Sequence, residues 1–157
     1  MAQTLADEIV QKVPGVGGLY HRLLLVVGPS GIGKTAALQG AASRTGAPLV
    51  NVNLELSRRL LDLSERRRAF ELPGILREVL EGCGSLALLD NIEILFDVSF
   101  QQDPLRLPQG LARNRTVVAA WNGTVDGQHV LYAAPGHPEY RRYPASDLVI
   151  VSPKPTA

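Results

Sequence analysis

The strongest constraint on this chain is one eight-residue segment, Gly28-Pro29-Ser30-Gly31-Ile32-Gly33-Lys34-Thr35. It fits the pattern Gly-x-x-x-x-Gly-Lys-Ser/Thr at every fixed position. The apolar run Leu23 to Val27 precedes it, and the Ala-rich segment Thr35 to Ser43, of high helix propensity, follows it. A strand, a glycine-rich loop and a helix in this order predict a phosphate-binding loop, whose backbone N–H groups surround a polyphosphate. The residues expected to bind the nucleotide are Gly28, Pro29, Ser30, Gly31, Ile32, Gly33, Lys34, Thr35 and Ala36.

Two side chains of this segment predict more specific chemistry. Lys34 is expected to reach the β and γ phosphates, and the Thr35 hydroxyl to bind Mg²⁺. Lys34 is one of only three lysines, beside thirteen arginines. Because lysine is rare in this chain, a chance match to the motif is a weaker explanation. The predicted cofactors are therefore ATP and Mg²⁺.

A second element of such a site is an acid at the end of a buried strand. Leu86 to Leu89 is apolar and ends on Asp90, which is expected to bind the same Mg²⁺. Many P-loop ATPases place Glu directly after this Asp, whereas this chain has Asn91 and then, two residues on, Glu93. Glu93 is a candidate general base if the backbone turns there, and Asn91 is a candidate for positioning water. Fast hydrolysis does not follow from this pattern.

Asn122 is the third candidate element. It follows the apolar segment Thr116 to Ala120 and Trp121, where ATPases of the AAA class place a polar sensor of the γ-phosphate. Asn122-Gly123 is also a turn dipeptide, and the two interpretations are compatible.

Strand and helix patterns alternate along the chain. Strands are expected at 23–27, 49–53, 86–90, 116–120 and 148–151, and helices at 5–13, 35–43, about 72–81 and 104–112. This alternation predicts a single domain over 1–157, a three-layer α/β/α P-loop NTPase core with a five-stranded, mainly parallel sheet. Residues 1–18 are expected to form a helix and linker, and 152–157 a short tail without a helical lid. Asp126-Gly127 predicts a β-hairpin within 122–143.

Composition excludes several other classes. A net charge of +1 argues against a DNA coat protein, and a lone cysteine, Cys83, excludes an internal disulfide and favours a reducing compartment. The chain has no 18-residue apolar stretch and no signal-peptide pattern, so a cytoplasmic protein without a membrane partner is expected. It also lacks an acidic-x-Lys nuclease element, clustered metal-ligand spacing and a Gly-x-Ser-x-Gly elbow.

The arginines fall into four clusters, at 58–59, 66–68, 113/115 and 141–142. Solvated helix faces are the plain interpretation. Arg141 and Arg142 are alternatively a finger that reaches the nucleotide of a neighbouring copy, which implies a homo-oligomer. Arg66 to Arg68 are alternatively a contact to DNA phosphates or to an acidic partner.

Four segments together resemble the BrxF family, the small P-loop proteins of type 3 bacteriophage exclusion (BREX) systems. They are Asn51 to Ser57, Leu89 to Phe96, Ala120 to Gly123 and Tyr132 to Tyr140. The resemblance covers about Leu23 to Tyr143 and implies an AAA-like ATPase of bacterial antiphage defence, acting beside other BREX proteins. It assigns nucleotide contacts to Gly28 through Thr35, Asp90 and Asn122.

Three functions remain open from the sequence. The first is an ATP-hydrolysing switch or motor subunit, and the second is a non-hydrolysing adaptor that uses bound nucleotide to dock partners or DNA. The third is a small-molecule or nucleotide kinase, for which only the Arg-rich segment 57–70 offers an acceptor site and lid. A GTPase is disfavoured because no Asn-Lys-x-Asp element occurs.

Overall fold

The structure is a computed structural model that describes residues 4–146 and 148–152. Its main sheet has the strand order β2-β3-β4-β1-β8, with every pair parallel. The strands are β1 (Leu23–Gly28), β2 (Leu49–Asn51), β3 (Leu86–Asp90), β4 (Thr116–Asn122) and β8 (Val149–Val151). The predicted five-stranded parallel sheet is confirmed.

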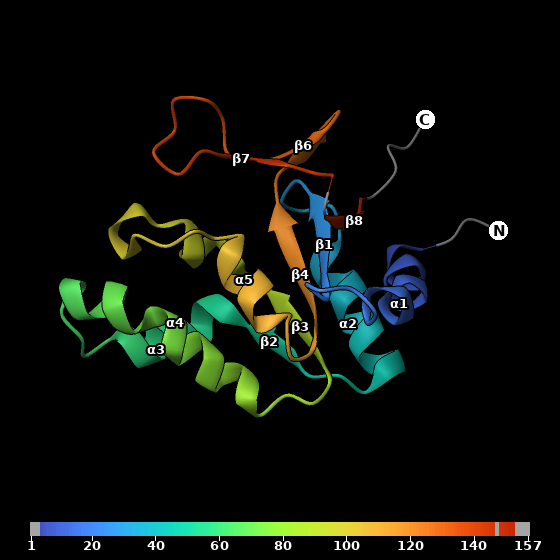
Figure 1. The fold of residues 1–157 in the computed structure, drawn as a ribbon, viewed down its shortest axis with the longest axis horizontal. Helices are drawn as coiled ribbons and strands as arrows, with labels where there is room; N and C mark the ends of the chain where they lie inside the picture. The colour runs from blue at the N-terminus through green and yellow to red at the C-terminus, as the bar shows by residue number, and fades with distance from the viewer. Residues whose placement is uncertain (1–3, 147, 153–157) are drawn as a thin grey trace.

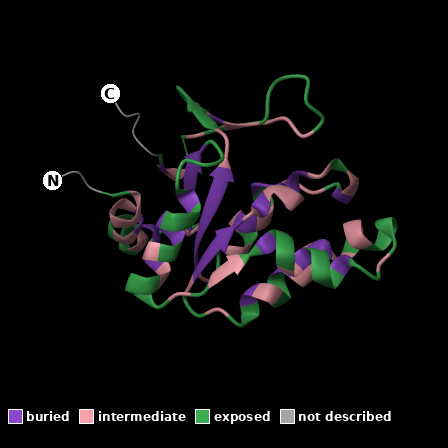
Figure 2. Ribbon diagram, turned by 180° about the vertical axis from the view of Figure 1, so that it is seen from behind, coloured by how far each residue is buried: buried purple, intermediate pink, exposed green. Residues whose placement is uncertain are grey.

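Helices cover both faces of this sheet (Figure 1). One face packs against α1 (Leu5–Val16) and α2 (Lys34–Thr45). The other packs against α3 (Val52–Leu60), α4 (Glu65–Glu81), the 3-10 helix η1 (Ile92–Phe96) and α5 (Arg106–Leu111). Alternate residues of β1 enter the two cores, so the strand is buried on both sides as its continuous apolar run predicts (Figure 2).

The predicted strand at 49–53 is wrong beyond its third residue. The strand ends at Asn51, whose side-chain Oδ1 accepts a hydrogen bond from the backbone N–H of Leu54 at 3.1 Å. Asn51 is thereby the N-cap of α3. The alternation that suggested a strand is the first turn of a helix whose buried residues, Val52, Leu56 and Leu60, recur every four positions.

The helix expected from about residue 72 begins seven residues earlier, at Glu65. Ser64 caps it, its Oγ accepting from the backbone N–H of Arg67 at 3.3 Å. Pro73, inside the helix, lacks the N–H that would bond the carbonyl of Ala69. The side chain of Gln102, next to the 3-10 helix η2 (Val98–Phe100), donates to that carbonyl at 2.9 Å instead. The proline is tolerated because a distant amide replaces the lost donor.

Replacing the cap tests this account of α4. We expect Ser64→Ala to lower the free energy of unfolding by about 1 kcal/mol, because one N-terminal N–H loses its partner. Urea denaturation followed by circular dichroism measures the change. Ser57→Ala makes the same chemical change at an exposed position inside α3 and should leave stability unchanged or slightly raised. Equal stability of the wild type and Ser64→Ala would show that the cap contributes nothing.

A three-stranded antiparallel sheet follows β4 and is called the small sheet. It consists of β5 (Thr124–Asp126), β6 (His129–Tyr132) and β7 (Arg141–Pro144). The predicted hairpin at Asp126-Gly127 is present, with Gly127 at φ 55° and Asp126 paired to His129. β6 and β7 lie above the carboxyl end of β4, and the exposed loop between them extends away from the body (Figures 1 and 2).

Three further boundaries differ from expectation. α1 runs through Pro14 to Val16 instead of ending at Val13, and α5 is confined to Arg106–Leu111. β8 begins one residue late, at Val149, and of the predicted tail only Ser152 is among the described residues. Among these residues no helix is long and apolar enough to cross a membrane.

Candidate functional site

The loop between β1 and α2, residues 28–35, is called the phosphate loop. Gly31 and Gly33 lie at φ 85° and 97°, in the left-handed region where a side chain is strained. A Cβ at either position would meet nothing within 4 Å, so the space beside them is open. Gly33 is also the N-cap of α2 and supplies no side-chain cap, which leaves the N–H groups of the first turn available to an anion.

Lys34 lies folded over this loop. Its ammonium donates to the carbonyls of Gly28 at 2.7 Å and Pro29 at 2.6 Å, and the residue is only 5% exposed. Burial lowers the pKa of Lys34, an effect that the negative charges of Glu93 and Asp90 partly oppose. The ammonium is therefore held beside the loop by two neutral carbonyl oxygens. A phosphate oxygen, which is a charged acceptor, can take their place.

Asp90 is fixed at the end of β3 by two hydrogen bonds. The Thr35 hydroxyl donates to its Oδ2 at 2.7 Å, and the backbone N–H of Asn91 donates to its Oδ1 at 2.9 Å. Asp90 is 7% exposed. A hydroxyl and a carboxylate in contact form the oxygen donor set that Mg²⁺ prefers, so Thr35 and Asp90 fit this ion.

The backbone turns sharply after Asp90. Asn91 lies at φ 55° and ψ 53°, and the chain then enters η1. Asn tolerates this left-handed conformation better than most residues. β3 therefore ends before Glu93. The backbone turn that the role of Glu93 as a general base requires is present.

Glu93 contacts Asn122 across the site, its Oε1 accepting a hydrogen bond from the Asn122 amide. Asn122 reaches this position because β4 lies between β1 and β3 and pairs Asn122 with Gly28. The sensor candidate and the base candidate thus form one hydrogen-bonded pair.

The phosphate loop, Asp90 and this pair enclose one cavity of about 320 Å³. Its lining residues are Ser30, Gly31, Gly33, Lys34, Thr35, Asp90, Asn91, Glu93 and Asn122. They come from three segments that are far apart in sequence, 30–35, 90–93 and Asn122, and they meet because three neighbouring parallel strands end at the same edge of the sheet. The described lining residues hold one cation and two carboxylates, an arrangement suited to a phosphate chain together with a divalent ion.

The structure does not bring Arg141 or Arg142 to this cavity. Both lie in β7, and a guanidinium nitrogen of Arg142 is 3.3 Å from Nδ1 of His129 on β6. The predicted nucleotide contacts that are likewise not among its described lining residues are Gly28, Pro29, Ile32 and Ala36.

Several arginines of the other clusters bind groups within the chain. Arg58, Arg59 and Arg67 lie within 4.0 Å of carboxylates on α3 and α4. Arg68 donates to the carbonyls of Leu61 and Leu63 in the turn between these helices. Arg115 donates to the carbonyls of Leu80 and Cys83, at the C-terminal end of α4. These contacts account for much of the arginine content without a nucleic acid.

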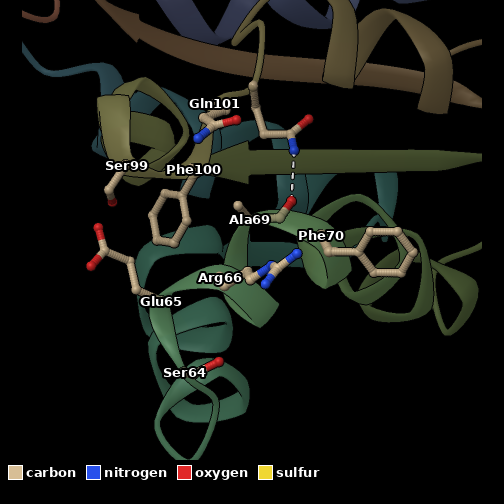
Figure 3. A pocket seen from close by; sticks show the side chains of 9 residues that line it. Ser64, Glu65, Arg66, Ala69, Phe70, Ser99, Phe100 and Gln101 are labelled. Atoms are coloured by element: carbon tan, nitrogen blue, oxygen red, sulfur yellow. Dashed lines mark hydrogen bonds between the residues drawn. The ribbon is translucent and has the colours of Figure 1, made fainter.

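A larger hollow of about 780 Å³ lies between the start of α4 and η2 (Figure 3). Glu65 and Arg66 are its only charged lining residues among those described, and Phe70 beside them is 86% exposed. It has no glycine-rich turn and no paired carboxylates. The smaller cavity at the phosphate loop is therefore the candidate functional site.

Comparison with solved structures identifies the fold. PCH-2 from C. elegans superposes with a TM-score of 0.51 at 19% identity, over 81% of this chain and 40% of that chain. The fold is that of a P-loop NTPase. AMPPCP-bound DnaA from Aquifex aeolicus gives a TM-score of 0.45 at 19% identity, over 75% of this chain and 37% of that chain. This chain thus spans well under half the length of these proteins. No protein-family model and no curated protein sequence matches it.

Proposed function

We propose that this chain is an ATP-binding and ATP-hydrolysing P-loop subunit. The observation that supports this most directly is the convergence of Lys34, Asp90, Glu93 and Asn122 on one cavity beside the phosphate loop. Phosphoryl transfer to water uses a group of each of these kinds. Lys34 is a cation for the phosphates and Asp90 is an acid for the metal. Glu93 is a base for the attacking water, and Asn122 is a polar group for the γ-phosphate.

Binding of ATP would exchange hydrogen bonds that the chain already makes. The ammonium of Lys34 would leave the carbonyls of Gly28 and Pro29 for phosphate oxygens, and the N–H groups at the start of α2 would face the same oxygens. Mg²⁺, held by Thr35 and Asp90, would neutralise phosphate charge. These residues orient the triphosphate and exclude water from part of it.

Hydrolysis needs a base for the attacking water. The water oxygen would bond to the γ-phosphorus while its proton passes to the Glu93 carboxylate and the bond between the γ-phosphorus and the β–γ bridging oxygen breaks. ADP and phosphate are then the products. Asn122 would hold the carboxylate through the hydrogen bond present in the structure.

Calorimetry of the purified chain with ATP and Mg²⁺ tests binding, and phosphate release tests hydrolysis. We expect Lys34→Met, which keeps an unbranched side chain without its charge, to weaken ATP binding by about 10- to 100-fold, as loss of a hydrogen bond to a charged group does. Lys12→Met, on an exposed position of α1, should leave binding unchanged. Absence of ATP binding by the wild type would refute the proposal. Binding without phosphate release would support the non-hydrolysing adaptor.

We further propose that the active form is an assembly of copies. Lys34 is the one cation among the described lining residues, whereas phosphoryl transfer commonly uses a second, mobile one. Arg141 or Arg142 of a neighbouring copy would supply it. Replacing both by alanine should lower the hydrolysis rate without changing the mass of the assembly measured by light scattering.

The proposed biological role is bacterial antiphage defence as a BREX component, in the cytoplasm and beside other BREX proteins. The support is the resemblance of the segments around Asn51, Asp90, Asn122 and Tyr132 to the BrxF family. Contact with DNA is part of this proposal, and Arg66 is the member of its arginine cluster that faces the open hollow at α4. Loss of phage protection on introducing Lys34→Met into such a system is the expected result.

A further inference from the structure

Glu93 and Phe96 occupy the same face of η1. Side chains three residues apart in a 3-10 helix eclipse one another, and η1 runs from Ile92 to Phe96. Whatever fixes the ring of Phe96 therefore also fixes the rotation of the short helix that presents the Glu93 carboxylate. Nothing in the sequence pattern indicates this link.

The ring of Phe96 is held between two aromatic residues. It stacks on Tyr132 with a centroid distance of 3.6 Å and an interplanar angle of 16°. Trp121 meets it edge-on at 5.0 Å and 79°. Phe96 is 1% exposed, so this packing leaves it little freedom.

Tyr132 belongs to the small sheet and not to the P-loop core. Two hydrogen bonds tie that sheet to the core: Trp121 donates through Nε1 to the carbonyl of Leu131 at 3.1 Å, and the Tyr143 hydroxyl donates to Asp103 at 2.9 Å. The stack of Tyr132 on Phe96 is a further connection, and it contacts the helix of Glu93 directly. Burial, with help from the charges of Glu139 and Glu93, raises the pKa of Tyr132 to about 12, so its ring stays neutral at physiological pH.

We propose that Tyr132 is a positioning residue for Glu93, acting through its stack on Phe96. The inference rests on the proposed function, because it concerns the step in which Glu93 accepts a proton from water. Asn122 holds the carboxylate at its tip, and Tyr132 holds the helix beneath it. A displacement of about 1 Å at such a group is enough to slow a reaction by up to about 100-fold.

Substitutions at Tyr132 separate positioning from binding. Tyr132→Leu keeps an apolar side chain without a ring, and we expect it to lower kcat for phosphate release at least tenfold while changing the affinity for AMPPCP less than twofold. Tyr132→Phe keeps the ring and should retain at least half of the wild-type kcat. Tyr20→Leu, at a tyrosine that is 70% exposed and outside the cavity lining, is the matched control and should behave as wild type.

A double-mutant cycle shows whether Tyr132 acts through Glu93. In the Glu93→Gln background, Tyr132→Leu should cause no further loss of kcat. An equal tenfold loss in that background, an unchanged kcat in Tyr132→Leu, or a loss confined to AMPPCP affinity would each overturn the proposal. Thermal unfolding establishes that the variants are folded at the assay temperature. If Tyr132→Leu is not folded, Tyr132→His, which keeps a smaller aromatic ring, is measured with a severalfold loss expected.

Failure of the proposed function gives a different result. A wild-type chain that does not bind AMPPCP would contradict the nucleotide site itself. A wild-type chain that binds AMPPCP but releases no phosphate from ATP would contradict both hydrolysis and the role of Tyr132 in it. Normal binding and turnover in the wild type, together with an unaffected Tyr132→Leu, would contradict only the positioning role.

Discussion

Glu93→Gln should lower the rate of phosphate release by about 100- to 10,000-fold while leaving ATP binding intact. A positioned general base contributes about this much, and the loss corresponds to about 3–5 kcal/mol of activation free energy. The glutamine oxygen can still accept the hydrogen bond from Asn122, so the geometry of the pair is retained. Removing a negative charge from the cavity proposed to bind a triphosphate should favour ATP binding. The measurements are single-turnover phosphate release and calorimetry with ATP and Mg²⁺.

The matched control removes the competing candidate, Asn91. Its φ of 55° makes alanine a strained replacement, so Asn91→Gly is the informative variant, since glycine adopts this conformation freely. We expect it to hydrolyse ATP within a few-fold of the wild-type rate. A loss as large as that of Glu93→Gln would instead identify Asn91 as the residue that positions water.

The sequence predicts the core of the fold because its signals are local and strong. The run Leu23 to Val27 is apolar without interruption, as a strand buried on both faces requires, and the glycine-rich turn that follows admits few alternatives. Likewise, the apolar segment before Asp90 could only be a buried strand or a buried helix. The parallel order of the strands then follows from the alternation with helices.

The start of α3 shows where local patterns fail. Asn51-Val52-Asn53 alternates polar and apolar residues as a strand does, but these residues are equally compatible with a helix N-terminus. The cap at Asn51 and the four-residue spacing of Val52, Leu56 and Leu60 decide the matter. That spacing is present in the sequence and would have located the helix. By contrast, the hydrogen bond that compensates for Pro73 joins Gln102 to Ala69, 33 residues apart, and no local sequence pattern indicates it.

The site residues likewise fall into those that local motifs predict and those that depend on the tertiary fold. Lys34, Thr35 and Asp90 belong to local motifs, whereas the pairing of Glu93 with Asn122 depends on β4 lying between β1 and β3. The turn at Asn91 is what carries Glu93 out of the strand direction and toward Asn122.

Gly123→Ala should be a highly disruptive single-methyl change. A Cβ at this position would lie 1.9 Å from the backbone oxygen of Leu131 and 2.9 Å from Nε1 of Trp121. The oxygen belongs to β6 and already accepts the hydrogen bond of that indole. Because the obstacle is backbone, a rotamer change cannot relieve it, and β6 must move away from β4.

We expect this variant to lose about 3 kcal/mol or more of unfolding free energy, at or above the upper end of ordinary overpacking. Its hydrolysis rate should fall as well, because Gly123 follows Asn122 directly and its N–H donates to the carbonyl of Gly28 at 3.1 Å, the oxygen that Lys34 also contacts. Urea denaturation and phosphate release measure the two effects.

Gly84→Ala provides the comparison, since a Cβ at Gly84 would meet nothing within 4 Å and should change stability by no more than about 0.5 kcal/mol. If Gly123→Ala unfolds at the same urea concentration as Gly84→Ala, the small sheet is not packed on β4 as described. The Phe96–Tyr132 stack would then lose its support, since it requires β6 to lie directly over the end of β4. Stability of Gly123→Ala therefore tests the contact on which any influence of the small sheet over Glu93 depends.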